Sequence, residues 1–343
     1  MLRLGRILLG LSMLTAVLAA QTDAERLRLA WPTANHAYAN GEPLEAYIQP
    51  TVSGLVESGL FGCVRSSGNQ FHEALDLMPI ERDRRGEATD LVYTVLEGVV
   101  RHINPRAGAS SYGRYVVIEH DTVSPAIYTL YAHLASVDSG IAVGRRVNTA
   151  QVIGVMGRSA GGYTIPKDRA HVHFEMGVRM TDQFQDWYDW KKFGSRNDHG
   201  LWNGMNLVGF DPKAFYDAFR AQEVNTFDEF LRASKPAVTV RVATTVTPDF
   251  VLRYPSLQVT NSTPLPVAGW EVTFDRFGLP FAWRPLEQAE VEGYRSLEAQ
   301  VVWTDDDLLK SCRCKDLVRY RSGKPQPDRD LQTALQLLFG IRR

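Results

Sequence analysis

Two short stretches of the sequence bring together residues that could hold a metal ion or move protons. In HVHFE, His171 and His173 stand two apart in a run whose alternate positions are apolar. Because a β-strand sends alternate side chains to opposite faces, both imidazoles would project from the same face. In FHEALDL, His72 and Asp76 stand four apart and would share a face on either a strand or a helix. Imidazole and carboxylate groups clustered in this way indicate a metal site or a proton-transfer site.

The FHEALDL stretch allows two interpretations, because Glu73 directly follows His72. On a helix it would be a variant of the H-E-x-x-H zinc motif, with Asp76 in the place of the second histidine. Pro79 follows closely and Gly68 comes shortly before, which leaves little room for a long helix. We therefore expect a strand or an extended loop. Glu73 would then face away from its neighbours as a solvated or salt-bridged carboxylate, and would not be a general base.

Three β-like segments must position these groups. YVVIEHD (115–121), AIYTLYAHL (126–134) and HVHFEMGV (171–178) are short runs rich in β-branched and aromatic residues. His133 ends the second run, where it shares a face with Tyr131. Glycines in VGRRV and GVMGRSAGG fall where strands would have to turn. This part of the chain is therefore predicted to be mainly β.

Together these motifs resemble, in order and approximate spacing, those of the lysostaphin-type (LytM-type) zinc metallopeptidases. The resemblance covers roughly residues 50–180. It rests on His72-x-x-x-Asp76, Tyr131-Ala-His133-Leu, Gly144-x-x-Val147 followed by Gln151-x-Ile153-Gly154-x-x-Gly157, and His171-x-His173-Phe-Glu. One departure is Ala74, which stands where the family has glycine between the first two ligands. The added methyl group would either tighten the backbone near the metal or be harmless.

The resemblance implies one zinc ion (Zn2+) per chain, held by His72, Asp76 and His173. It also implies that His133 and His171 lie beside the metal and act on the catalytic water and the transition state, with the general base of the pair left open. Two imidazoles and one carboxylate leave one tetrahedral position free, as in catalytic zinc sites. The implied fold is a small antiparallel β-sheet that forms a groove. The implied substrate is the peptide part of peptidoglycan.

The peptidase domain is placed at residues 51–234, and it is expected to carry an insertion. Residues 179–210 are rich in aromatic residues and asparagine, and are interpreted as a surface insertion that could wall the groove. Asp211 with Pro212 predicts the start of a helix, and Thr226 predicts the start of a second short helix by its capping-box spacing.

A boundary near residues 234–236 is expected to separate the peptidase domain from the rest of the chain. Residues 236–343 read as a second, mostly β module of unknown role, or as a long embellishment of the first, and end in a helix near 328–339. The predicted fold class is therefore mainly β, with short flanking helices. Since every candidate site residue lies before residue 180, the second module is expected to be dispensable for bond cleavage.

Residues 1–20 have the layout of a signal peptide. Arg3 and Arg6 precede an apolar run that ends in small residues. The alternative is an uncleaved N-terminal anchor. No later segment is apolar enough to span a bilayer, so the mature protein is expected to be periplasmic or extracellular without a membrane span. Residues 21–50 are predicted to be a loosely structured N-terminal lead-in.

Charge and cysteine content limit the possible partners and bonds. With 38 basic and 39 acidic residues, the chain has a net charge of −1 and lacks the basic excess of a nucleic-acid-binding protein. In an exported chain, Cys63 is expected to pair with Cys312 or Cys314, because a bond between the last two would close a very small ring. A metal site at the Cys-x-Cys pair lacks a second cysteine pair to support it. The oligomeric state stays open.

The function that follows is an exported zinc metalloendopeptidase that cuts the cross-links or stem peptides of peptidoglycan. Two alternatives stay open. One is a non-catalytic LytM-type domain that regulates a partner such as a cell-wall amidase, and the other is a zinc peptidase that acts on protein substrates. Non-catalytic domains of this type typically lose zinc ligands, whereas here every ligand position and both accessory histidines are present.

Overall fold

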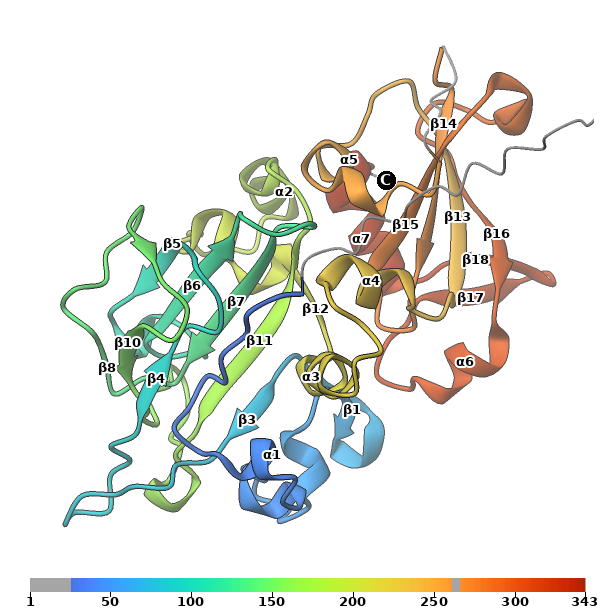
Figure 1. Cartoon of the computed structure of the whole chain (residues 1–343). Helices are drawn as coiled ribbons and strands as arrows, with labels where there is room; N and C mark the ends of the chain where they lie inside the picture. The colour runs from blue at the N-terminus through green and yellow to red at the C-terminus, as the bar shows by residue number, and fades with distance from the viewer. Residues whose placement is uncertain (1–25, 261–265, 343) are drawn as a thin grey trace, which may run out of the picture.

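Two antiparallel β-sheets dominate the computed structural model, which describes residues 26–260 and 266–342 (Figure 1). The larger sheet has the strand order β12-β11-β7-β6-β5-β9, and β3 pairs with β11. Its strands are β3 (Leu75–Leu77), β5 (Gly98–Asn104), β6 (Tyr115–His120), β7 (Ile127–Ala132), β9 (Arg146–Val147), β11 (Val172–Arg179) and β12 (Leu207–Phe210). The predicted fold class, mainly β with antiparallel sheets and short helices, is confirmed. The predicted signal peptide, 1–20, lies outside the described residues.

Strand β11 is the element on which the site depends. All of its residues are buried, which fits a sequence in which His173 and Glu175 are the only charged or titratable side chains before Arg179. One edge of β11 pairs with β7, and the other edge pairs first with β3 and then with β12. Because both edges are hydrogen-bonded, the strand holds its side chains in fixed positions.

Smaller β elements surround this sheet. Strands β4 (Leu91–Tyr93), β10 (Val152–Val155) and β8 (Ser136–Val137) form a three-stranded sheet, and β1 (Gly62–Arg65) pairs with β2 (Gln70–His72) as a hairpin. Strands β2 and β3 hold FHEALDL in extended backbone, as predicted. Residues 26–50 have little regular structure beyond α1 (Ala37–Asn40), yet Ile48 is fully buried and bridges to Leu77.

Most aromatic residues of segment 179–210 pack into the core, although Phe193 is exposed. Helix α2 (Phe184–Lys191) buries Phe184, Trp187 and Tyr188, and the Trp187 indole donates a hydrogen bond of 3.2 Å to the Gln336 side chain. The end of the segment is β12, which belongs to the large sheet. These aromatic side chains are therefore held by the interior and by the C-terminal helix.

The two helix starts expected from capping residues are confirmed. Helix α3 (Pro212–Arg220) begins after Asp211, whose carboxylate accepts from the Ala214 amide, and α4 (Phe227–Arg232) begins after Thr226. Short 3-10 turns connect other elements: η1 (Leu44–Ala46), η2 (Val56–Gly59), η3 (Ser66–Gly68), η4 (Ala107–Ala109), η5 (Lys167–Arg169), η6 (Gly200–Trp202), η7 (Gly204–Asn206), η8 (Pro255–Leu257) and η9 (Gln288–Val291).

Beyond residue 236 the chain forms a second antiparallel sheet of order β15-β14-β13-β16. The strands are β13 (Val238–Ala243), β14 (Gly269–Phe274), β15 (Pro280–Leu286) and β16 (Ala299–Thr304), followed by the hairpin β17 (Val318–Arg321) and β18 (Lys324–Pro327). The helices here are α5 (Asp249–Arg253), α6 (Asp306–Ser311) and α7 (Arg329–Phe339). One continuous hydrophobic cluster includes residues from both sheets, such as Phe174 and Val240. The division into separate domains stays a prediction.

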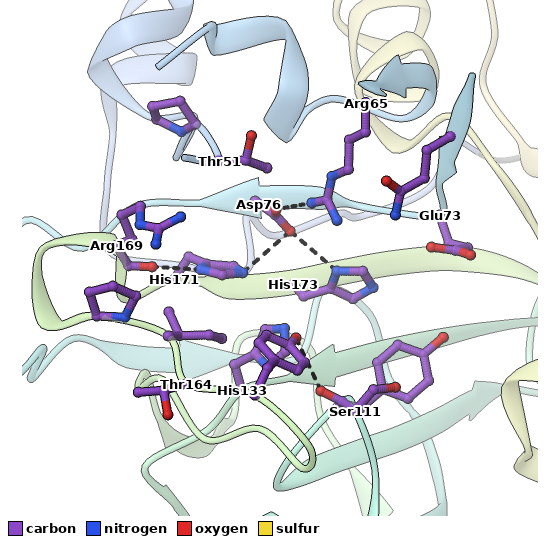
Figure 2. A pocket seen from close by; sticks show the side chains of 16 residues that line it. Thr51, Arg65, Glu73, Asp76, Ser111, His133, Thr164, Arg169, His171 and His173 are labelled. Carbon is purple, nitrogen blue, oxygen red and sulfur yellow. Dashed lines mark hydrogen bonds and ion pairs between the residues drawn. The ribbon is translucent and has the colours of Figure 1, made fainter. Parts of the chain in front are cut away.

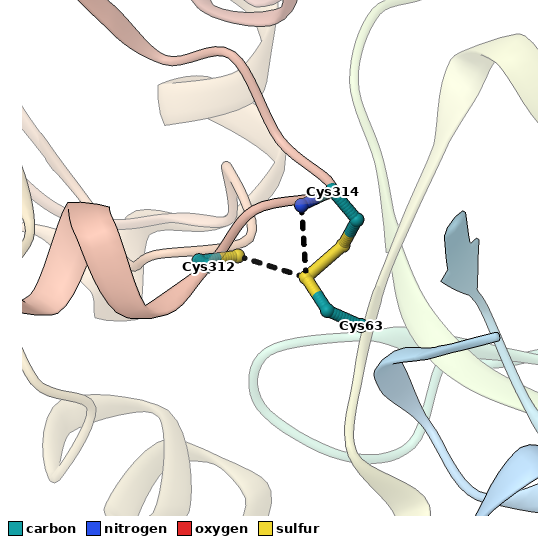
Figure 3. Close-up of side chains that lie close together, drawn as sticks. All are labelled: Cys63, Cys312 and Cys314. Carbon is teal, nitrogen blue, oxygen red and sulfur yellow. Dashed lines mark hydrogen bonds between the residues drawn. A yellow bond between two sulfur atoms is a disulfide. The ribbon is translucent and has the colours of Figure 1, made fainter. Parts of the chain in front are cut away.

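A disulfide joins the second sheet's half of the molecule to the β1–β2 hairpin (Figure 3). It links Cys63 to Cys314, and Cys312 is a buried free thiol whose sulfur lies 3.2 Å from that of Cys63. The expected pairing of Cys63 with one of the two late cysteines is confirmed. Nearby, Phe277 packs against both Phe61 and Phe71. Among the described residues, no helix has the length and apolar character needed to cross a membrane.

Candidate metal centre

The three residues predicted to hold zinc converge at one buried point. His72 ends β2, Asp76 is central in β3, and His173 lies directly opposite Asp76 in the β3–β11 register. The Nε2 atom of His72 lies 3.1 Å from Oδ1 of Asp76, and Nδ1 of His173 lies 3.2 Å from the same oxygen. The two imidazole nitrogens are 3.3 Å apart.

These distances fit a zinc ion. Ligand atoms that sit about 2.0–2.1 Å from a tetrahedral metal are separated from one another by about 3.3 Å. The donor set of two imidazoles and one carboxylate is also one that zinc prefers. The described residues therefore offer three correctly spaced ligands, and Ala74, which is fully buried between β2 and β3, is accommodated beside them.

Each ligand is held in place by a second contact. Nδ1 of His72 donates to the Leu60 carbonyl at 2.7 Å, which leaves Nε2 free for the metal. Oδ2 of Asp76 accepts from Arg65 at 2.5 Å, while Oδ1 faces the histidines (Figure 2). Such outer contacts fix the tautomer and orientation of metal ligands.

Glu175 provides the second contact for His173. Its buried carboxylate accepts from Nε2 of His173 at 3.0 Å and from the hydroxyl of Tyr128 at 3.0 Å. Burial and the charge of Glu175 raise the pKa of both Tyr112 and Tyr128 well above the usual value, so both hydroxyls stay protonated. His171 and His173 share a face, as the sequence indicated, and Glu175 continues the same alternation along β11; its tyrosine partner was not predicted.

The charges of the metal-free site are balanced. Burial opposes ionisation of Asp76, but electrostatic interactions with the His72 and His171 imidazoles and hydrogen bonds from His173 and His72 hold its pKa well below the usual value. Burial also opposes protonation of His173, but hydrogen bonds to Asp76 and Glu175 raise its pKa to about 9. A cation that takes the Nδ1 lone pair of His173 must therefore displace a proton.

His133 and His171 lie beside this centre, as predicted. Their ring centroids are 4.8 Å apart, and Nε2 of His171 lies 3.6 Å from Oδ1 of Asp76. Nδ1 of His133 donates to the Ser159 carbonyl and Nδ1 of His171 donates to the Arg169 carbonyl, both at 2.8 Å. Burial lowers the pKa of both residues, so each is neutral with Nε2 available as a proton acceptor.

Backbone geometry directs His133 into the site. Strand β7 ends at Ala132, and His133 itself has a φ of 61°, in the left-handed region that non-glycine residues rarely adopt. Its amide donates to the Tyr112 carbonyl at 2.9 Å, which holds this conformation. Strained residues of this kind cluster at functional sites.

A cavity of about 520 Å³ opens onto the centre. It is lined by Asp76, His133, His171 and His173 together with Arg65, Glu73, Tyr112, Tyr163 and Arg169, among others. No residue of 179–210 lines it, so the idea that the aromatic segment walls the groove is wrong. Sequence reasoning missed Arg65, Tyr112 and Arg169 as residues that line the site.

Three comparisons place the chain among known proteins. The sequence model of peptidase family M23 matches residues 78–186, a span that includes His133, His171 and His173 and begins just after Asp76. None of the curated proteins matches the chain.

Several solved structures are similar at low identity. The catalytic domain of lysostaphin from Staphylococcus simulans is 18% identical, with 51% of this chain and 95% of that chain covered and a TM-score of 0.30. The catalytic domain of the M23 protein EnpA from Enterococcus faecalis is 18% identical, with 38% and 79% covered and a TM-score of 0.27. A zinc-containing peptidase from Vibrio cholerae is 21% identical, with 44% and 33% covered and a TM-score of 0.23. The match of residues 78–186 to the model of peptidase family M23 agrees with the resemblance of the ordered motifs to the lysostaphin-type metallopeptidases.

Proposed function

We propose that the protein is an exported zinc metalloendopeptidase that hydrolyses peptide bonds in the cross-links or stem peptides of peptidoglycan. The observation that carries the proposal is the arrangement of His72, Asp76 and His173 at mutual distances of 3.1, 3.2 and 3.3 Å, with two neutral histidines aimed at the same point. The family match supports a peptidase.

The chain's own residues supply the proton transfers of this reaction. Zinc, when bound by the three ligands, would lower the pKa of a coordinated water towards about 7 and polarise the scissile carbonyl. Both His133 and His171 begin with an unprotonated Nε2, so either can accept the proton of the attacking water. The same nitrogen then donates that proton to the amide nitrogen as the C–N bond breaks, which yields one carboxylic acid and one amine.

The fixed tautomers make this shuttle effective. Because the carbonyls of Ser159 and Arg169 hold Nδ1 of each ring, neither imidazole can rotate without losing a buried hydrogen bond. The proton must therefore enter and leave through Nε2. A positioned acid–base group of this kind contributes about 100- to 10,000-fold to the rate.

Export is part of the proposal. Residues 1–20 have the layout of a signal peptide, and the bond between Cys63 and Cys314 is of a kind that forms and persists in oxidising compartments. Both features support a periplasmic or extracellular location, where peptidoglycan lies.

Digestion of purified sacculi tests the function. The zinc-loaded protein is expected to release soluble muropeptides with new amino termini, and the His171→Ala protein, matched for zinc content, is expected to release few. A protein that binds zinc and sacculi but cuts nothing would indicate a regulatory domain. Cleavage of unfolded protein substrates with intact sacculi would indicate a general zinc peptidase.

A further inference from the structure

The cavity beside the metal centre contains one cationic group without a partner. Arg169 closes the turn η5 and is half-buried in the cavity wall. Within residues 26–260 and 266–342, its guanidinium makes no hydrogen bond or ion pair. The backbone carbonyl of Arg169, in contrast, is occupied by Nδ1 of His171.

Three neighbouring cations are paired with carboxylates of the protein. Arg158 and Lys167 both pair with Glu87, at 2.8 and 3.2 Å. Arg65, the other arginine in the cavity wall, pairs with Asp76. Arg169 is therefore the exception among the basic side chains around this cavity, and its five N–H donors are free for a ligand.

The turn that carries Arg169 is tied down. Arg82 donates to the carbonyls of Lys167 and Asp168, at 2.6 and 3.3 Å, and Lys167 donates to the Arg85 carbonyl at 2.8 Å. A guanidinium on a tethered turn loses less conformational freedom when it binds a ligand than one on a mobile loop. The position of Arg169 is thus suited to recognition.

Charge is distributed unevenly along the cavity. Figure 2 shows Arg169 on the His171 side of Asp76 and Glu73 on the opposite side, beyond His173. Because Arg65 is paired with Asp76, the arginine and carboxylate side chains of the described residues that are left without a partner in the cavity wall are Arg169 at one end and Glu73 at the other. A peptide that crosses the metal centre would meet the positive end next to His171.

We propose that Arg169 binds a carboxylate of the peptide substrate and thereby selects acidic peptides for cleavage. This inference rests on the proposed peptidase function. A guanidinium matches a carboxylate with two parallel N–H···O bonds, and in a peptide the carboxylate can belong to an acidic side chain or to a free carboxyl terminus. Arg169 lies beside the reacting groups without taking part in proton transfer, so its contribution is to substrate selection.

The test uses one cross-linked muropeptide dimer in four forms. The dimer has free carboxylates, amides at its carboxyl termini, amides on its acidic side chains, or amides at both places. Wild-type protein is expected to cleave the form with the recognised carboxylate about 10- to 100-fold better, in kcat/KM, than its amidated counterpart. In Arg169→Gln this ratio should fall to near one, while Arg169→Lys should retain part of it.

Arg84→Gln is the matched control, because this substitution removes the same charge at an exposed residue that does not line the cavity. It should keep the wild-type ratio. The two singly amidated forms show whether the recognised group is terminal or on a side chain. A ratio near one in wild type, or a wild-type ratio in Arg169→Gln at full zinc content, would overturn the assignment of Arg169.

Failure of the proposed function gives a different result. If zinc-loaded wild-type protein cleaves none of the four dimers, the peptidase proposal falls, and calorimetric binding of the same dimers decides the role of Arg169. Tighter binding of a carboxylate form that disappears in Arg169→Gln would support carboxylate recognition. Equal binding of all four forms, or no binding, would refute carboxylate recognition by Arg169.

Discussion

Replacing Glu175 by glutamine is expected to change how zinc binding depends on pH. In the metal-free site, Asp76 and Glu175 accept hydrogen bonds from the two ring nitrogens of His173 and, against the effect of burial, raise its pKa to about 9. At pH 7 zinc must displace the Nδ1 proton, which weakens its apparent affinity about tenfold for each pH unit below the pKa. Two units correspond to about 100-fold.

The substitution acts in two opposing ways. Glutamine removes one of the charges that stabilise the imidazolium, so the pKa of His173 should fall towards its ordinary value of about 6.5 and proton competition at pH 7 should weaken. The loss of the outer carboxylate should also lower zinc affinity itself by about 10- to 100-fold. The second effect should dominate at pH 9, where only about half of wild-type His173 holds its extra proton and proton competition is weak.

Competition with a chelator of known affinity measures the zinc dissociation constants of both proteins at pH 7, 8 and 9. The ratio of the zinc dissociation constants of Glu175→Gln and wild type should increase with pH, by up to about 100-fold between pH 7 and 9. Ionisation of a zinc-bound water adds the same slope to both proteins and cancels in the ratio. Glu119→Gln, on neighbouring β6 and paired with Arg101, is the control. A ratio that is constant over this range would refute the assigned pairing of His173.

The stability of the metal-free protein should depend on pH through the protonation of His173. Because the folded-state pKa of His173 is raised, its contribution is fully present below about pH 6.5 and is lost as pH rises through about 9. Urea unfolding of the metal-free protein should therefore show a loss of stability across this window in wild type, and a smaller loss in Glu175→Gln.

Three further predictions concern the site and its support. His173→Ala should lose its zinc, as measured by elemental analysis, and full zinc content would contradict the role of His173 as a ligand. His133→Ala and His171→Ala should keep zinc but lose about 100- to 10,000-fold in turnover. Near-normal rates in both would contradict their role in proton transfer. Cys314→Ser should unfold about 2–4 kcal/mol more easily in urea than wild type, because the disulfide closes a loop with a sequence separation of 251, while Cys312→Ser should not lose the bond. A chain ending near residue 235 should aggregate, as measured by size-exclusion chromatography, because it would expose the hydrophobic cluster shared by both sheets. A soluble, active fragment would show that the second half is dispensable.

The part of the site that could be predicted from the sequence is the part carried by local periodicity. The two-residue spacing of His171 and His173 puts both side chains on the same face of a strand. The prediction that FHEALDL is extended likewise puts His72 and Asp76 on one face. The order of the motifs, compared with the lysostaphin-type family, added His133 to the predicted site. All of these depend on residues within a few positions of one another or on a resemblance that spans only the peptidase region.

The contacts that could not be predicted join residues far apart in the chain. Arg65 reaches Asp76 from the β1–β2 hairpin, 11 positions away. Tyr128 on β7 reaches Glu175 on the neighbouring strand β11, 47 positions away, and Trp187 on α2 reaches Gln336 on α7, 149 positions away. Aromatic residues in a polar segment look alike whether they wall a groove or fill a core. Only the position of α7 decides between the two.

The hairpin that supplies His72 and Arg65 explains why the second half of the chain bears on the metal centre. A two-stranded hairpin of this size is marginally stable by itself. Here it is held from the far side by the Cys63–Cys314 bond, by Phe277 against Phe71, and by Arg313, which donates to the Ser67 carbonyl at 2.8 Å. Since zinc affinity depends on how firmly its ligands are held, residues near 277 and 313 support the site although they lie far from it in sequence. The expectation that the second module is dispensable for bond cleavage rests on the positions of the reacting groups alone, and it stays a prediction; these contacts argue that the second half also holds His72 in place.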